Sequence, residues 1–182
     1  MDPKRVGVSG YSATGHEIAD AITSAADRFA AAVLANTDPG SLNQYLSYVD
    51  FYPRDAVQTV AEVMAGAKPY GEGIQNWVQN APGFATNKIR APVLVSVADP
   101  FHLMELWGFY ASLRDQGKAV DLQYIRSGDH NIAKPLQKLA HQEMIVDWFD
   151  FWLNNHEDSD ASKADQYERW HKLREARADL GL

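Results

Sequence analysis

The sequence predicts an α/β fold in which a mainly parallel sheet is flanked by helices, and three observations support this prediction. Short apolar runs recur along the chain, as expected for strands that a parallel sheet buries on both faces. Segments with helical periodicity separate most of these runs. The chain has 182 residues, which is enough to bury one substantial hydrophobic core without metal or disulfide support.

A strand, a helix and a second strand are predicted at the start of the chain. Val6–Ser9 is a short apolar run, and Phe29–Ala35 is a longer one that suits a buried parallel strand. Between them, the segment 13–26 has apolar residues at helical spacing, namely Ile18, Ala21, Ile22 and Ala25. This order predicts a βαβ unit.

The pattern changes to helical pieces between Asn36 and Lys88. Glycines interrupt these pieces, as do prolines at positions 39, 53, 69 and 82. We therefore predict a helical insertion at about residues 37–88, between two elements of the sheet.

The α/β alternation resumes after the insertion. Ala91–Val97 and Val120–Ile125 predict two further strands, and Met104–Gln116 predicts the helix that joins them. Glu143–Leu153 carries one stripe typical of a helix packed on a sheet, formed by Ile145, Trp148, Phe149 and Trp152. In the last segment, 156–182, aromatic and leucine side chains recur every three residues, which predicts a helical extension with one narrow apolar seam.

Composition argues against several classes of partner. Lys and Arg number 17 against 24 Asp and Glu, so the formal charge of −7 disfavours binding to nucleic acid or to an anionic membrane surface. The sequence has no run of about 18 consecutive apolar residues that would span a bilayer. It also has no cysteine, and therefore no thiol nucleophile and no Cys-based zinc site. We predict neither a cofactor nor a metal.

The stretch "GVSGYSATG", which contains Ser12, resembles a tight turn from a strand into a helix. A nucleophilic serine in an α/β-hydrolase sits at such a turn between small residues, because its backbone conformation crowds larger neighbours. Gly10 lies two residues before the serine, while Thr14 stands where a second glycine usually follows. Taken alone, the motif fits a structural turn about equally well.

Two later residues supply the partners that a serine nucleophile needs. Asp99 follows the strand "PVLVSV", and His130 follows "VDLQYI", so Ser12, Asp99 and His130 would meet at one edge of a parallel sheet. Asp99 also fits a loop or capping residue of the next helix. Glu105 is an alternative acid, since the segment "ADPFHLMEL" could present either carboxylate.

The remaining histidines lack a comparable position at the end of a strand. We therefore assign them structural or solvent roles; they are His16, His102, His141, His156 and His171.

Most of the chain closely resembles the carboxyl-terminal catalytic part of prolyl oligopeptidase family serine peptidases. The resemblance rests on "DPKRVGVSGYSATGHE", "APVLVSVADP", "FYASLRDQGKAVDLQYIRSGDH" and "EMIVDWFDFWL". The turn "GVSGYSATG", together with "NIAKPLQKLAHQEMIVDWFDFWL" and "ADQYERWHKLR", is most similar to the bacterial branch of the family that includes lasso-peptide isopeptidases. The resemblance implies Ser12 as nucleophile, His130 as base, Asp99 as acid and the Ala13 N–H as oxyanion donor. In that branch the acid can be a glutamate, which keeps Glu105 open.

The resemblance also sets the domain boundaries that we expect. Residues 1–155 would be a partial α/β-hydrolase catalytic domain, and residues 156–182 a carboxyl-terminal helical extension. Family members carry earlier catalytic strands and a β-propeller, so this chain would correspond to the second half of the catalytic domain and would need the first half. We expect a serine peptidase acting on short peptides or isopeptides; the alternatives are an esterase or acyl-peptide hydrolase, or a truncated, non-catalytic hydrolase fragment.

Overall fold

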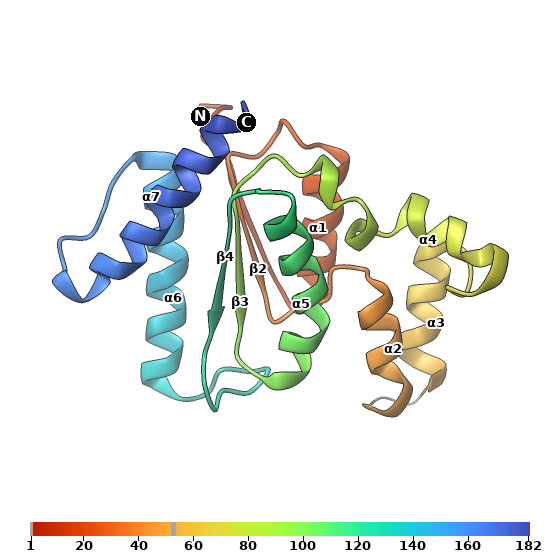
Figure 1. Cartoon of the computed structure of the whole chain (residues 1–182). Coiled ribbons are helices and arrows are strands. Elements are labelled where there is room, and N and C mark those ends of the chain that lie inside the picture. The colour runs from red at the N-terminus through yellow and green to blue at the C-terminus, as the bar shows by residue number, and fades with distance from the viewer. Residues whose placement is uncertain (1, 52–53) are drawn as a thin grey trace.

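The computed structural model describes residues 2–51 and 54–182, and within these ranges four strands form one parallel sheet. The strands are β1 (Gly7–Tyr11), β2 (Ala31–Ala35), β3 (Val93–Val97) and β4 (Val120–Tyr124), which lie side by side in sequence order (Figure 1). Each neighbouring pair runs parallel. The predicted parallel α/β architecture is therefore confirmed.

Helices cover both faces of the sheet. Helices α1 (Ala13–Ser24) and α5 (Pro100–Asp115) pack on one face, and α6 (Pro135–Phe149) packs on the other, with α7 (Ala164–Asp179) beside it (Figure 1). Every residue of β2 and β3 is buried. Burial on both faces explains why these strands are continuous apolar runs rather than alternating ones.

The insertion between β2 and β3 is helical and has a small core of its own. It contains α2 (Leu42–Phe51), α3 (Arg54–Ala65) and α4 (Ile74–Asn80), which stand beside α1 and α5 (Figure 1). Their shared core consists of Tyr45, Ala65, Trp77 and Ala81. The predicted break at Pro53 lies outside the described residues.

Two helices extend further than their periodicity indicated. Helix α5 begins at Pro100 because the Asp99 side chain caps it, and proline is well tolerated in the first turn. Helix α6 begins at Pro135 and continues past Phe149 as a π-helical segment, Asp150–Asn154. Sequence periodicity found the apolar stripes of both helices and missed their first turns, although the missed parts include the buried side chains of His102 and His141.

The last helix packs through aromatic side chains. Tyr167 and Trp170 of α7 are buried against Trp148 and Phe151, with the Trp148 and Trp170 rings edge to face at 5.1 Å. The narrow apolar seam predicted for this segment is the surface that faces α6. Across the described ranges, no helix is both long and apolar enough to span a bilayer.

Candidate active site

Ser12 occupies a strained turn between β1 and α1. Its φ of 56° and ψ of −135° lie in a region that non-glycine residues rarely adopt. Space around the turn is limited, because a Cβ at Gly10 would lie 2.6 Å from the Thr14 carbonyl oxygen and 2.7 Å from the Gly15 Cα. The glycine before the serine is thus required by close backbone approach.

The residues after Ser12 hold the turn in place. The Thr14 hydroxyl donates to the Tyr11 carbonyl at 2.6 Å and accepts from the Tyr11 N–H at 3.1 Å. A Cβ at Gly15 would lie only 2.3 Å from the Thr37 Oγ1, whose hydroxyl donates to the Ser12 carbonyl at 2.6 Å. Close packing against Thr37, two residues after β2, therefore requires glycine one position later than the motif suggests, and the two Thr14 hydrogen bonds stabilise the turn.

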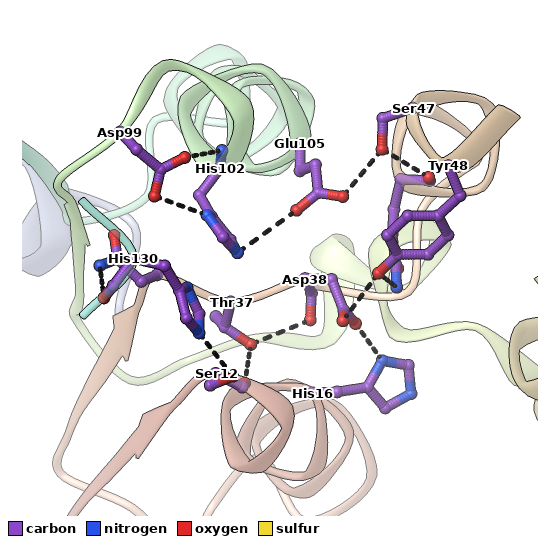
Figure 2. A network of polar contacts seen from close by, with 12 residues as sticks. Ser12, His16, Thr37, Asp38, Ser47, Tyr48, Asp99, His102, Glu105 and His130 are labelled. Atoms are coloured by element: carbon purple, nitrogen blue, oxygen red, sulfur yellow. Dashed lines mark hydrogen bonds and ion pairs between the residues drawn. The ribbon is translucent and has the colours of Figure 1, made fainter. Parts of the chain in front are cut away.

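His130 reaches Ser12 from the loop between β4 and α6. Its Nε2 lies 2.9 Å from the Ser12 Oγ (Figure 2). The His130 carbonyl accepts hydrogen bonds from the Asn36 Nδ2, at 2.9 Å, and from the Tyr11 hydroxyl. The structure thus brings the predicted serine and histidine together and anchors the backbone of the histidine.

Asn36 links the ends of three strands and was not singled out from the sequence. It follows β2 with a φ of 40°, a left-handed conformation that asparagine tolerates better than most residues. Its Oδ1 accepts from the Ala98 N–H at 2.7 Å while its Nδ2 binds the His130 carbonyl. A lone Asn after a buried strand, where a turn needs αL backbone, is the signal that could have identified it.

Asp99 lies beside the pair, but its hydrogen bonds go to a different histidine from the one we expected. Its Oδ1 caps α5 by accepting from the His102 N–H at 3.0 Å, and its Oδ2 lies 2.8 Å from the His102 Nδ1 (Figure 2). Among the residues that the structure describes, the buried Nδ1 of His130 has no hydrogen-bond partner. The expected direct Asp99–His130 hydrogen bond is therefore absent, and His102, for which we predicted a structural or solvent role, lies at the site next to both residues.

Glu105 is also close to the site, and within the part of the chain that the structure describes its polar contacts are to Ser47 and His102 rather than to His130. Its Oε1 lies 2.8 Å from the Ser47 Oγ, and its Oε2 lies 3.9 Å from the His102 Nε2. Burial raises the pKa of Glu105 to about 8, the Ser47 hydrogen bond opposes this rise, and the negative charges of Asp38 and Asp99 add to it. A carboxyl group that is largely protonated at neutral pH is poorly suited to stabilise an imidazolium.

The electrostatic surroundings favour neutral His130. Burial lowers its pKa most, positive charge on His102 lowers it further, and the negative charge of Asp99 acts in the opposite direction. A neutral imidazole can accept a proton from a serine hydroxyl, so the surroundings suit a base.

Asp99, His102 and His130 also present nitrogen and oxygen atoms that all lie within 4.8 Å of one another. This set could in principle ligate a cation. However, the two imidazole rings stack at 4.6 Å with 21° between their planes, and Asp99 is already bonded to His102. We interpret the cluster as a hydrogen-bonding network around the base.

A cavity of about 210 Å³ lies between α1 and the helical insertion, next to Ala13. Its lining is largely apolar and includes Ala61, Met64 and Trp77, together with polar side chains such as Asp38. Ala13 is the first residue of α1, where helix N–H groups lack intrahelical partners and the helix dipole is positive.

Comparison with known proteins agrees with this fold. The model of the family described as "Prolyl oligopeptidase family" matches residues 1–156. The architecture is that of the α/β-hydrolase peptidases. Since the match covers most of the sequence, the chain belongs to the prolyl oligopeptidase family, and it is a peptidase-type hydrolase by family.

Individual relatives are much longer than this chain. The lasso peptide isopeptidase AtxE2 of Asticcacaulis excentricus is 28% identical over 183 residues, covering 97% of this chain and 24% of AtxE2. A structure of AtxE2 with Astexin3-dC4 bound matches with a TM-score of 0.78 and 26% identity, over 97% of this chain and 26% of that one. The acylaminoacyl peptidase of Pyrococcus horikoshii shares the fold, with a TM-score of 0.66 at 19% identity over 90% of this chain and 26% of that chain. The chain thus spans about a quarter of the relatives it matches.

Proposed function

We propose that this chain carries the catalytic groups of a serine peptidase that cleaves peptide or isopeptide bonds. The observation that supports this most strongly is the 2.9 Å contact between the Oγ of Ser12, on a strained turn, and the Nε2 of His130. A serine hydroxyl is a weak nucleophile at neutral pH, and an adjacent neutral imidazole supplies the base that activates it.

In the proposed reaction, Ser12 Oγ bonds to the carbonyl carbon of the substrate while its proton passes to His130 Nε2. The carbonyl π electrons move to the oxygen, which the Ala13 N–H stabilises as an oxyanion donor. Collapse of this intermediate breaks the C–N bond, and His130 returns the proton to the leaving amine. Water then attacks the acyl-serine ester with His130 again as base, which regenerates Ser12.

Asp99 is the proposed acid of the triad, in preference to Glu105. Its carboxylate acts electrostatically on His130 in the direction that stabilises an imidazolium. The raised pKa of Glu105 supports the same choice, because a neutral carboxyl group cannot supply the opposing charge.

A peptide or isopeptide substrate is supported by the AtxE2 structure that holds Astexin3-dC4. The largely apolar cavity beside Ala13 offers a place for one substrate side chain. An ester or acyl-peptide hydrolase, with the same nucleophile and base, is the alternative within enzymes.

We further propose that full activity needs additional strands beside β1, supplied by the remainder of a longer protein. Strand β1 lies at the edge of the sheet, although it also carries the nucleophile turn. A hollow of about 600 Å³ runs along β1 and α6 and is lined by Ser9, Tyr11 and His141 among others. An edge strand in this position offers backbone groups to a further strand.

Labelling with a fluorophosphonate probe tests the proposed function. We expect one covalent adduct per chain, at Ser12, which is lost in Ser12→Ala and strongly reduced in His130→Gln. Ser9→Ala is the matched control, because Ser9 is an exposed serine on the same strand and has no role in the proposed reaction. Labelling that persists in Ser12→Ala would overturn the assignment.

A further inference from the structure

Both oxygens of the Asp99 carboxylate are engaged by the same residue. Oδ1 accepts from the backbone N–H of His102 at 3.0 Å, and Oδ2 pairs with the His102 Nδ1 at 2.8 Å. Since an ionised carboxylate can only accept, the Nδ1 of His102 is the donor in this pair. The acid of the proposed triad is therefore held by His102.

The acid of a catalytic triad normally accepts a hydrogen bond from the Nδ1 of the base, and in the described part of the chain the Nδ1 of His130 has no such partner. The Nδ1 of His130 is buried without a hydrogen-bond partner, a costly condition for a buried polar atom. The His102 ring stacks directly on the His130 ring, with centroids 4.6 Å apart (Figure 2). An Asp99 oxygen also lies within 4.8 Å of a His130 ring nitrogen, close enough for rotation of the side chain to change its partner.

We propose that His102 is a positioning residue that holds Asp99 away from His130 until positive charge develops on the base. This proposal rests on the proposed function. Oδ1 stays fixed to the His102 backbone N–H, so the carboxylate pivots and only Oδ2 transfers. The transfer is driven by proton movement from Ser12 to His130, because an imidazolium attracts the carboxylate more strongly than a neutral ring does.

Among the groups around His130, Asp99 is the anion whose position allows it to transfer a hydrogen bond to the His130 ring. On β1, Tyr11 contributes a neutral ring 5.4 Å from the His130 ring and a hydroxyl that binds the His130 carbonyl. Asn36, after β2, is neutral, and Ser12 at the start of α1 is the proton donor. On α5, Glu105 is separated from His130 by His102.

Two further ionisable groups lie near His130, namely Asp129 and His102, and neither can take the place of Asp99. Asp129, next to His130 in the β4–α6 loop, is exposed to solvent, where its charge is screened. His102 faces the base with a ring that can carry a positive charge, which lowers the pKa of His130. Both the hydrogen bond and the charge of His102 therefore oppose an imidazolium.

Two substitutions of His102 distinguish the effect of its hydrogen bond to Asp99 from the effect of its ring packing against His130. His102→Phe retains a flat ring against His130 but has no nitrogen for Asp99, whereas His102→Asn retains an amide donor near the position of Nδ1. The backbone N–H that holds Oδ1 remains in both variants. We expect Phe to release Oδ2 to His130 and Asn to keep it in place.

The first readout is the pH profile of fluorophosphonate labelling. In His102→Phe we expect its acidic limb to move to higher pH by about one unit, because an ion-paired imidazolium is harder to deprotonate. We expect a smaller shift in His102→Asn, which loses the charge of His102 but keeps a donor for Asp99, and we expect Asp99→Asn to reduce the shift of His102→Phe to that smaller value in the double variant. An unchanged limb in His102→Phe, or an equal shift with and without Asp99, would overturn the proposal.

The second readout does not depend on activity. The imidazole N–H resonances of His130, followed by NMR with Ser12→Ala as the host protein, report whether Nδ1 donates to a carboxylate. At a pH where His130 is neutral, we expect a strongly downfield Nδ1 proton in His102→Phe that disappears on adding Asp99→Asn and is absent without the His102 change. If that resonance is already present with His102 in place, the proposal is wrong, whereas absence of labelling in every variant would instead refute the proposed function.

Discussion

Replacing Asn36 with alanine tests how the structure holds the base in place. The Asn36 side chain joins the His130 carbonyl, at 2.9 Å, to the Ala98 N–H, at 2.7 Å, and the residue is 1% exposed. Truncation removes both hydrogen bonds and leaves the Ala98 N–H in the interior with its partner gone. The loop that carries His130 then keeps only the Tyr11 hydroxyl as a side-chain donor to this carbonyl, among the contacts of the described residues.

The expected loss of stability follows from three contributions. Leaving the buried Ala98 N–H unsatisfied costs about 1–3 kcal/mol, and losing the bond to His130 costs about 0.5–1.5 kcal/mol. The φ of 40° at position 36 adds roughly 1 kcal/mol, since alanine tolerates left-handed backbone less well than asparagine. Together these contributions predict a fall of about 2.5–5.5 kcal/mol in the free energy of unfolding.

Urea unfolding measures this loss, and the rate of fluorophosphonate labelling at Ser12 measures its effect on the base. Tyr11→Phe is the matched control, because it removes the other donor to the His130 carbonyl and leaves the Ala98 N–H paired. We expect Tyr11→Phe to lose only about 0.5–1.5 kcal/mol. Equal losses in the two variants, or unchanged labelling in Asn36→Ala, would refute the role assigned to Asn36.

Three further predictions concern the turn, the base and the buried acid. Gly15→Ala should destabilise the fold by about 1–3 kcal/mol, because the new Cβ would collide with Thr37; urea unfolding measures this, and a neutral effect would contradict the packing argument. Burial and His102 lower the pKa of His130, and the neutral form of His130 is the base, so the rate of Ser12 labelling should begin to fall only below the ordinary histidine pKa of about 6.5. A pH profile of labelling whose acidic midpoint lies above pH 6.5 would contradict this. For Glu105, the pKa in the folded state is raised to about 8 by burial, so the folded state binds more protons than the unfolded state between the two pKa values. Stability should therefore fall as pH rises from 5 through about 8 in the wild type and much less in Glu105→Gln, as urea unfolding across that range would show; equal pH dependence in the two proteins would contradict a protonated Glu105.

The sheet and the order of the site residues were predictable because both follow from local sequence. Buried parallel strands are continuous apolar runs, and the ends of such strands meet at one edge, which placed Ser12 and His130 together. Helix caps and first turns carry a weaker signal. The start of α5 at Pro100 was therefore missed although Asp99 had been considered as a cap.

The contacts among the site side chains were not predictable from strand order. His102 lies three residues after Asp99 in the first turn of α5, which places its ring and its backbone N–H within reach of the same carboxylate. A capping geometry of this kind competes with the reach of Asp99 toward His130. The role of Asn36 depends on tertiary contacts to Ala98 and His130, and the apolar pattern of one segment carries no information about such contacts.

Trapping the acyl-enzyme tests whether Ser12 is a nucleophile that His130 activates. The protein is mixed with a small activated ester, quenched in acid within the first turnover, and its mass and peptide map are measured. We expect one acyl group per chain on the peptide that contains Ser12, accumulating more slowly in His130→Gln and absent in Ser12→Ala. Acylation at another residue, or at Ser12 with an undiminished rate in His130→Gln, would contradict this expectation.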